Sequence, residues 1–250
     1  MPAIHLTVEA GVARIEIDNQ DVKNALSPEM ADDLVDACEQ IDGNHEVGAL
    51  VVTGAGRDFC SGADTRTWVD HDNPASDAAF ENTSRTYRAF MRVGNVAVPT
   101  VAAIRGVAVG AGTNLALAAD LRIVAHDARL LGFSRTRIHP GGGFLTLASR
   151  AMGREATAAV GLFGAELNGH DAVRVGLAWE TLPADDVVAR AMELAAIPAR
   201  DPELSRKVLH SFRVESAASA LSWDAAVEFE RGVQMWSLRR RHAALQAAAQ

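Results

Sequence analysis

The stretch of sequence that decides the fold reads GAGRDFCSGAD and covers residues 54–64. It follows Val47–Thr53, an apolar run with the length of a buried strand. A second stretch, GVAVGAG at residues 106–112, follows the strand-like run Val98–Ile104 and precedes Thr113–Ala119, a predicted helix. Both stretches are therefore predicted to connect a strand to a helix, an alternation that is typical of an α/β fold.

Connections of this kind can bind a ligand through the main chain. A turn at the start of a helix presents backbone N–H groups without partners, and glycine lets a ligand approach them closely. Such groups bind phosphate or stabilise an oxyanion that develops during a reaction. Two turns that converged on one point would form an oxyanion hole with two donors, whereas the alternative is that both are plain connections.

Other glycine motifs fit less well. Gly110–Leu115 begins like a dinucleotide fingerprint, but Leu115 stands where the third glycine belongs. The sequence contains neither G-x-x-x-x-G-K-[ST] nor G-x-S-x-G. NAD binding, a Walker-type NTPase and a serine nucleophile elbow are therefore not predicted.

The composition argues against several classes of protein. The 250 residues correspond to about 1.7 average domains, and 48% of them are hydrophobic. Lys and Arg number 24 against 32 Asp and Glu, a net charge of −8 that disfavours non-specific binding to nucleic acid. Two cysteines cannot build a disulfide framework, and no uncharged run reaches the ~20 residues that span a bilayer. With no signal peptide visible, we expect a cytoplasmic enzyme or binding protein that contacts no membrane.

The rest of the chain reads as strands and helices up to about residue 185, then as helices alone. Ile4–Glu9 and Val12–Ile17 alternate in polarity around Gly11, as in a hairpin. Ser27 and Pro28 are typical of a helix start, and Ala78–Val93 is predicted to be helical. We expect an α/β core over residues 1–197 and a helical C-terminal region over residues 198–250.

Several motifs occur together in a fixed order. They are Lys23–Ser27, Val52–Gly56, Phe59–Asp64, Gly106–Gly112, Leu115–Ala116, Asp120–Arg122, Pro140–Gly143 and Gly176–Ala178. In this order and spacing the chain resembles the enoyl-CoA hydratase/isomerase (crotonase) family from about residue 5 to residue 185.

The resemblance implies a ClpP-like spiral of ββα units whose C-terminal helices pack in homotrimers, often paired into hexamers. It implies an acyl-CoA thioester as ligand, with no prosthetic group and no metal. The shared chemistry of the family is stabilisation of a thioester enolate by two backbone N–H groups. By position these are the N–H groups of Ala63 and Ala111, and the helix start at Ala111 also favours an anion.

The resemblance also implies the segments that hold coenzyme A. Lys23–Leu26 and Ala63–Arg66 are similar to the family segments around the nucleotide and pantetheine. The predicted binding residues are Lys23, Ala25, Leu26, Ala63, Asp64, Thr65 and Arg66. Lys23 would meet a phosphate of coenzyme A, unless its side chain is simply solvated.

The sequence departs from the family's hydratases at both acid–base positions. Those enzymes use two glutamates, and Asn114 occupies the first position here. At the second, the best alignment places Arg135, with Ser134 as the alternative. No Asp or Glu occurs between Asp127 and Glu155, so no alignment restores that carboxylate. Since Asn orients water without taking its proton and Arg cannot act as a base, we predict very slow hydration of crotonyl-CoA.

Other residues are candidates for chemistry. His139 precedes the triple-glycine turn and is a catalytic candidate or a hydrogen-bonded turn residue. Asp70–Asp72 would supply an acid, a base or a metal ligand, unless this polar loop is solvated. Trp68 and Phe133 would line an acyl pocket or pack in the core.

Arg135 carries a separate hypothesis. Facing the pocket, it would favour an anionic acyl group and thus decarboxylation, isomerisation or C–C cleavage. Otherwise it pairs with a neighbouring acid and shapes the loop.

Two functions therefore remain. The first is a crotonase-type lyase or isomerase that acts on an acyl-CoA through the Ala63/Ala111 oxyanion hole. The second is a catalytically inactive protein that binds acyl-CoA and delivers it to a partner. Glu230–Trp236 resembles the family's C-terminal motif only faintly, so contacts from this tail to a neighbour's coenzyme A are not predicted.

Overall fold

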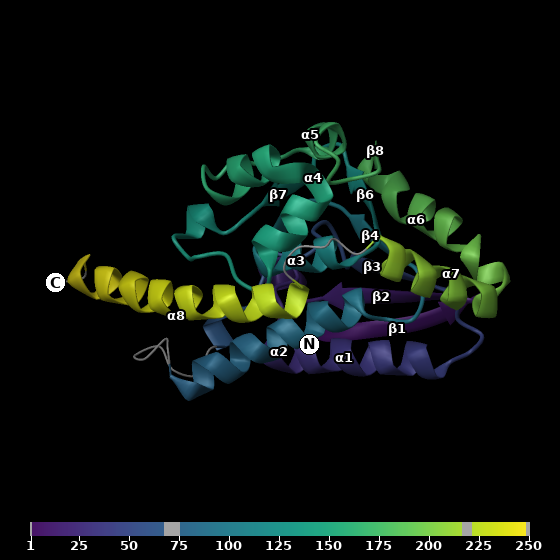
Figure 1. Ribbon diagram of the computed structural model, residues 1–250, viewed down its shortest axis with the longest axis horizontal. Coiled ribbons are helices and arrows are strands. Elements are labelled where there is room, and N and C mark those ends of the chain that lie inside the picture. Colours follow the sequence, from purple (N-terminus) through teal and green to yellow (C-terminus); the bar gives the residue numbers. More distant parts are fainter. Residues whose placement is uncertain (1, 68–75, 217–221, 249–250) are drawn as a thin grey trace.

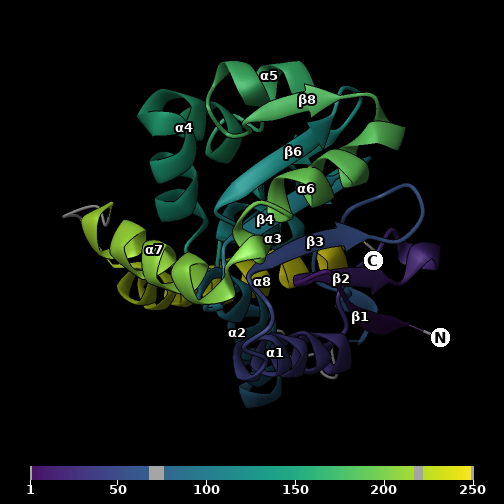
Figure 2. The same ribbon diagram turned by 90° about the vertical axis from the view of Figure 1, so that its right-hand side faces the viewer.

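The computed structural model describes residues 2–67, 76–216 and 222–248. One six-stranded sheet forms the centre of the α/β fold, in the order β1-β2-β3-β4-β6-β8. Its strands are β1 (Ala3–Glu9), β2 (Val12–Asp18), β3 (Ala49–Gly54), β4 (Thr100–Ile104), β6 (Leu121–Ala125) and β8 (Glu180–Leu182). The β1–β2 pair is antiparallel and the other pairs are parallel. Figure 2 shows the strands in this order from bottom to top.

A second, smaller layer lies beside the main sheet and carries the candidate site. Its parallel strands are β5 (Val107–Val109) and β7 (Arg129–Leu131). An isolated bridge joins Cys60 to Ala108 of β5, and another pairs Leu26 with Ala63. Strands β4 and β6 belong to the main sheet, whereas β5 and β7, which follow them in the sequence, belong to the second layer. The chain therefore passes from the main sheet to the second layer after β4 and again after β6.

Eight helices surround these layers in the described part of the chain. They are α1 (Pro28–Gly43), α2 (Asp77–Gly94), α3 (Ala111–Ala118), α4 (Phe144–Gly161), α5 (Gly169–Arg174), α6 (Val187–Ala195), α7 (Pro202–Glu215) and α8 (Trp223–Ala248). Helix α6 packs across β3, β4 and β6, and α1 packs against α2. Figure 1 shows α8 running beside α2 and beneath α4, with its C-terminal half extending beyond the other elements.

The predicted elements are largely confirmed, and two of them are corrected. The hairpin forms between β1 and β2, and the Ser27 hydroxyl caps α1 by accepting from the Met30 amide at 3.2 Å. The prediction that residues 106–112 form a plain turn is wrong, because Val107–Val109 pairs with β7 as strand β5. Helix α3 consequently starts at Ala111, two residues before the predicted Thr113.

Strand β8 is the last strand among the described residues, and helices follow it. The boundary at residues 197/198 stays a prediction. No helix in the described ranges is long and apolar enough to cross a bilayer. Within the same ranges, no three His, Cys, Asp or Glu side chains gather as a metal site.

Candidate active site

The two glycine-rich stretches lie against each other. The Cys60 amide donates to the Val107 carbonyl at 3.0 Å, and the Val109 amide donates to the Cys60 carbonyl at 3.1 Å. A Cβ on Gly112 would lie 2.0 Å from the Cys60 carbonyl oxygen, so only glycine fits there. Gly62 has a φ of +110°, and a Cβ on it would lie 2.9 Å from the Val109 carbonyl oxygen. These glycines are therefore required for the two segments to meet.

The backbone N–H of Ala63 points away from Leu26, the residue with which Ala63 is paired. In the parallel bridge to Leu26, the bonds run through the residues on either side of Ala63. The Leu26 amide donates to the Gly62 carbonyl at 2.8 Å, and the Asp64 amide donates to the Leu26 carbonyl at 2.8 Å. Because alternate residues of a strand point their N–H groups to opposite sides, the Ala63 N–H faces the other way.

Ala111 is the first residue of α3, and the first N–H groups of a helix have no intrahelical acceptor. Its preceding residue, Gly110, has a φ of +55° and turns the chain from β5 into the helix. The N-terminus of α3 also carries the positive end of the helix dipole. Ala63 and Ala111 are thus two backbone donors on two adjoining segments.

A cavity of about 250 Å³ opens where these segments meet. Its wall comes from both segments, from α2, from the loop before α4 and from α8. The lining residues are Ser61, Gly62, Ala63, Thr65, Thr83, Thr86, Tyr87, Val109, Gly110, Ala111, Asn114, Phe133, Thr136, Ile138 and Gln234. Five of the residues that the sequence analysis named therefore line this one cavity, namely Ala63, Thr65, Ala111, Asn114 and Phe133.

The lining is poor in groups that exchange protons. Among the described residues on this wall, none has a carboxyl, imidazole or amino side chain, and Tyr87 alone titrates. Burial raises the pKa of the Tyr87 phenol, so that its hydroxyl stays protonated at neutral pH. The described wall therefore offers hydrogen bonds rather than a general base.

Asn114, which the family resemblance predicts at the first glutamate position, is fully buried. Its Nδ2 donates to the Gly141 carbonyl at 2.8 Å, which fixes the orientation of the amide. Its Oδ1 has no hydrogen-bond donor in the described part of the chain. The side chain thus carries one buried acceptor without a partner among the described residues.

The two residues considered for the second glutamate position do not reach the cavity. Arg135 donates through Nε to the Gly164 carbonyl at 2.8 Å and forms an ion pair with Glu166 at 3.2 Å. Its side chain is 56% exposed. Of the two hypotheses for Arg135, the structure matches the alternative, in which Arg135 pairs with a neighbouring acid, because these two acceptors hold it on the outer surface. Ser134 donates to the Gly161 carbonyl, and from this loop Thr136 and Ile138 line the cavity instead.

His139 is not among the lining residues either. Its Nδ1 lies 2.6 Å from the Pro140 carbonyl oxygen, which matches the alternative of a hydrogen-bonded turn histidine. Trp68 and Asp70–Asp72 lie outside the described residues.

The predicted coenzyme A segments border the first glycine-rich stretch. Ala25 and Leu26 are buried, Lys23 is exposed, and the Lys23 carbonyl accepts from the Ser61 amide at 2.9 Å. Arg66 binds Asp64 through two hydrogen bonds of 2.9 and 2.8 Å, which hold the pKa of this buried carboxyl below its usual range. Asp64 therefore shapes the loop next to Ala63.

Sequence reasoning missed the wall that α2 and α8 provide. The Tyr87 hydroxyl on α2 donates to the side-chain oxygen of Gln234 on α8, and Gln234 donates to the His139 carbonyl at 3.3 Å. The Arg231 guanidinium lies 4.4 Å from the Phe80 ring centre and 5.0 Å from that of Tyr87. No local sequence pattern predicts these contacts, since they join residues far apart in the chain, such as Tyr87 and Gln234, which are 147 positions apart.

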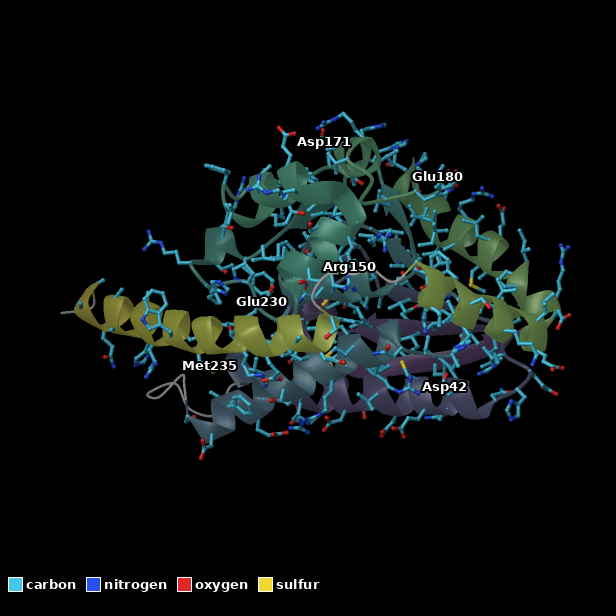
Figure 3. All side chains as sticks on the ribbon, viewed as in Figure 1. Asp42, Arg150, Asp171, Glu180, Glu230 and Met235 are labelled. Atoms are coloured by element: carbon cyan, nitrogen blue, oxygen red, sulfur yellow. The ribbon has the colours of Figure 1, made fainter. Side chains whose placement is uncertain are left out.

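Glu230 fastens α8 to the start of α4. Its carboxylate accepts from the amides of Gly143, Phe144 and Leu145 at 2.9 to 3.1 Å, and the side chain is buried. Figure 3 shows Glu230 on the side of α8 that faces α4. Burial raises the pKa of Glu230 to about 7, although the three amide donors act in the opposite direction. This contact holds Gln234, one helical turn further along α8, at the cavity.

Comparison with known proteins identifies the class. The sequence profile of the enoyl-CoA hydratase/isomerase family matches residues 7–242, and the chain belongs to this family. The chain is 41% identical to the Mycobacterium tuberculosis protein named probable enoyl-CoA hydratase EchA14, over 86% of this chain and 81% of the relative. It is 29% identical to the 1,2-epoxyphenylacetyl-CoA isomerase of Escherichia coli, over 91% of this chain and 87% of the relative.

The solved structures agree with the fold. An enoyl-CoA hydratase from Mycobacterium avium subsp. paratuberculosis superposes with a TM-score of 0.81 at 24% identity and covers 94% of this chain and 93% of its own. The α/β crotonase fold expected from the sequence is thus confirmed. The family acts on acyl-CoA and includes both hydratases and isomerases.

Proposed function

We propose that this protein binds the thioester end of an acyl-CoA in the cavity between its two glycine-rich stretches. The backbone N–H groups of Ala63 and Ala111 hydrogen-bond the thioester oxygen and stabilise the enolate that forms from it. The observation that carries the proposal is the convergence of these two residues on one cavity wall. Donors fixed in advance around a developing oxyanion supply a large part of the rate enhancement in such reactions.

The proposed reaction is a lyase or isomerase step on a CoA thioester, with weak hydration. Addition of water to an enoyl-CoA needs one group that takes a proton from water and another that protonates the α-carbon. The loss of such groups costs about 10²–10⁴ in rate. Asn114 cannot take the proton, and Arg135 lies on the outer surface.

Decarboxylation breaks a carbon–carbon bond without a protein base. In decarboxylation of a carboxylated acyl-CoA, the bond from the α-carbon to the carboxylate breaks, and CO₂ leaves. The electron pair of the broken bond moves onto the thioester, which becomes an enolate that Ala63 and Ala111 stabilise. Water then protonates the α-carbon. This step uses the two donors without the glutamates.

Turnover assays test the proposal. Purified protein is incubated with crotonyl-CoA, with β-keto and carboxylated acyl-CoAs, and with a saturated acyl-CoA in heavy water. We expect product from a carboxylated thioester, almost no hydration of crotonyl-CoA and little deuterium at the α-carbon, because the described cavity wall holds no base to remove that proton. A hydration rate typical of the family's hydratases would overturn the assignment of the reaction.

The second candidate is a binding protein without catalysis. It is supported by the lack of carboxyl, imidazole and amino side chains on the described cavity wall. Calorimetry separates the two candidates, because tight binding of acyl-CoA without any turnover or α-proton exchange favours the binding protein.

The segments Lys23–Leu26 and Ala63–Arg66 are proposed to hold coenzyme A. We also propose a homotrimer or a dimer of trimers built through the C-terminal helices, as the family resemblance implies. Sedimentation equilibrium measures this directly, and a monomeric mass would contradict it.

A further inference from the structure

A second cavity shares one residue, Tyr87, with the wall of the candidate active site. It lies between α2 and α8 and has a volume of about 410 Å³. Its wall combines the apolar side chains of Phe80, Met91 and Val227 with charged residues, Arg231 among them. Of the described residues that line either cavity, Tyr87 alone lines both. Tyr87 therefore forms the partition between them.

Three contacts hold the Tyr87 side chain in this position. Its hydroxyl donates to the side-chain oxygen of Gln234 on α8. Its ring centre lies 5.7 Å from that of Phe90 and 5.0 Å from the Arg231 guanidinium. Aromatic pairs and cations near a ring both stabilise its placement, so a ligand that displaced this ring would lose all three contacts. The partition is therefore a fixed part of the wall.

The active-site cavity has an open rim and a buried end. Thr65 and Thr136 on its wall are exposed. In contrast, Thr86 and Tyr87 of α2 and Gln234 of α8 are each 5% exposed. Because coenzyme A is a long, charged molecule, it must extend through the rim, and the acyl group then points toward the buried end.

The size of the cavity limits the acyl group. Its volume of about 250 Å³ lies below the roughly 300–1,000 Å³ that is usual for small-molecule sites. The Thr83 and Thr86 hydroxyls at its buried end donate to carbonyl groups of their own helix, so this end needs no polar partner and suits an apolar chain. A chain that is too long for the cavity meets the Tyr87 ring.

We propose that Tyr87 is a specificity-determining residue whose ring closes the acyl end of the site and restricts the protein to short-chain acyl-CoA thioesters. A longer chain reaches the second cavity only when the ring is removed, and it then packs against Phe80, Met91 and Val227. This limit deepens the proposed function and rests on it, because it requires the thioester to bind at Ala63 and Ala111.

The test compares saturated ligands that differ in chain length alone. Calorimetry with the full-length protein measures binding of butyryl-CoA, hexanoyl-CoA and octanoyl-CoA. Each methylene group buried on binding strengthens it by about 4-fold, so an unlimited site would bind octanoyl-CoA more than about 100-fold more tightly than butyryl-CoA. With the ring in place, we expect octanoyl-CoA to bind more weakly than butyryl-CoA. Equal or tighter binding of octanoyl-CoA overturns the limit and leaves the proposed function intact, whereas no binding of any thioester overturns the proposed function itself.

Three variants assign the limit to the ring. Tyr87→Ala joins the two cavities, and we expect it to bind octanoyl-CoA more tightly than butyryl-CoA. Tyr87→Phe loses the bond to Gln234 but keeps the ring, so it should keep the limit. Phe80→Ala is the matched control, because it removes an aromatic ring two turns earlier on α2 that lines the second cavity alone.

Phe80→Ala should keep the limit as well. Loss of the limit in either Tyr87→Phe or Phe80→Ala, or its survival in Tyr87→Ala, overturns the role of the Tyr87 ring. If Tyr87→Ala fails to fold, Tyr87→Val replaces it in the same comparison.

Discussion

Ala63 and Ala111 line the cavity from the two glycine-rich segments and are proposed to act through their main-chain N–H groups, whereas Tyr87 and Gln234 line it from α2 and α8 and are joined by a side-chain hydrogen bond. The first pair depends on backbone geometry alone, so alanine or glycine serves equally well at either position. The second pair depends on particular side chains and on how α8 is fastened at Glu230. In this site the proposed backbone donors therefore come from two adjoining segments, whereas part of the cavity wall comes from a helix that is distant in the sequence.

The largest expected effect comes from removing one backbone donor. Ala111→Pro deletes the N–H at the first position of α3, where proline is tolerated because its φ suits a helix start. The rate of decarboxylation of a carboxylated acyl-CoA should fall by about 10²–10³-fold, as for other oxyanion-hole donors. Ala111→Gly keeps the N–H and should retain the rate. Equal rates in the proline and glycine variants would contradict a role for this amide.

The second effect concerns the fastening of α8. Glu230→Ala leaves three buried amides of the α4 start unpaired, and the free energy of unfolding should fall by about 3 kcal/mol. Urea denaturation measures the change at about pH 6, below the pKa of Glu230. Glu228→Ala is the control, because that side chain is 67% exposed and should cost well under about 1 kcal/mol. Similar losses in both variants would show that the contact to α4 contributes little.

The pH dependence of the free energy of unfolding tests the same contact of Glu230 with α4. Burial raises the pKa of Glu230 from 4.5 to about 7, so the folded protein binds this proton more tightly than the unfolded chain. Stability from this group is therefore fully present below pH 4.5 and is lost as the pH rises through about 7. Relative to Glu230→Gln, which does not titrate, the wild-type protein should lose about 3 kcal/mol over this range. Parallel pH profiles of the two proteins would contradict the raised pKa.

The smallest effect is expected at Arg135. Its ion pair with Glu166 is exposed, and such pairs contribute about 0–1 kcal/mol. Arg135→Ala should leave the affinities for carboxylated and plain acyl-CoAs unchanged in calorimetry. A selective loss of affinity for the carboxylated thioester would show instead that Arg135 contributes to binding of this ligand.

The sequence predicted the parts of this site that local geometry encodes. Gly62 and Gly112 mark close approaches of the main chain, so their spacing identified both segments and the residues that follow them. Strand β5 was missed because three residues, Val107–Val109, lie within a glycine-rich stretch whose pairing with β7 is not local. The direction of Arg135 depends on Glu166, 31 residues away, and the wall at Gln234 depends on packing across the whole chain. Such contacts leave no periodic signal.

Infrared difference spectroscopy tests the central claim most directly, because it needs no knowledge of the reaction. A saturated acyl-CoA labelled with ¹³C at the thioester carbonyl is bound to the protein, and its carbonyl stretch is compared with that in water. Two donors on one oxygen weaken the carbonyl bond, so we predict a lower frequency in the wild-type protein and in Ala111→Gly, and a smaller shift in Ala111→Pro. A bound thioester with an unshifted carbonyl stretch in the wild-type protein would contradict the account.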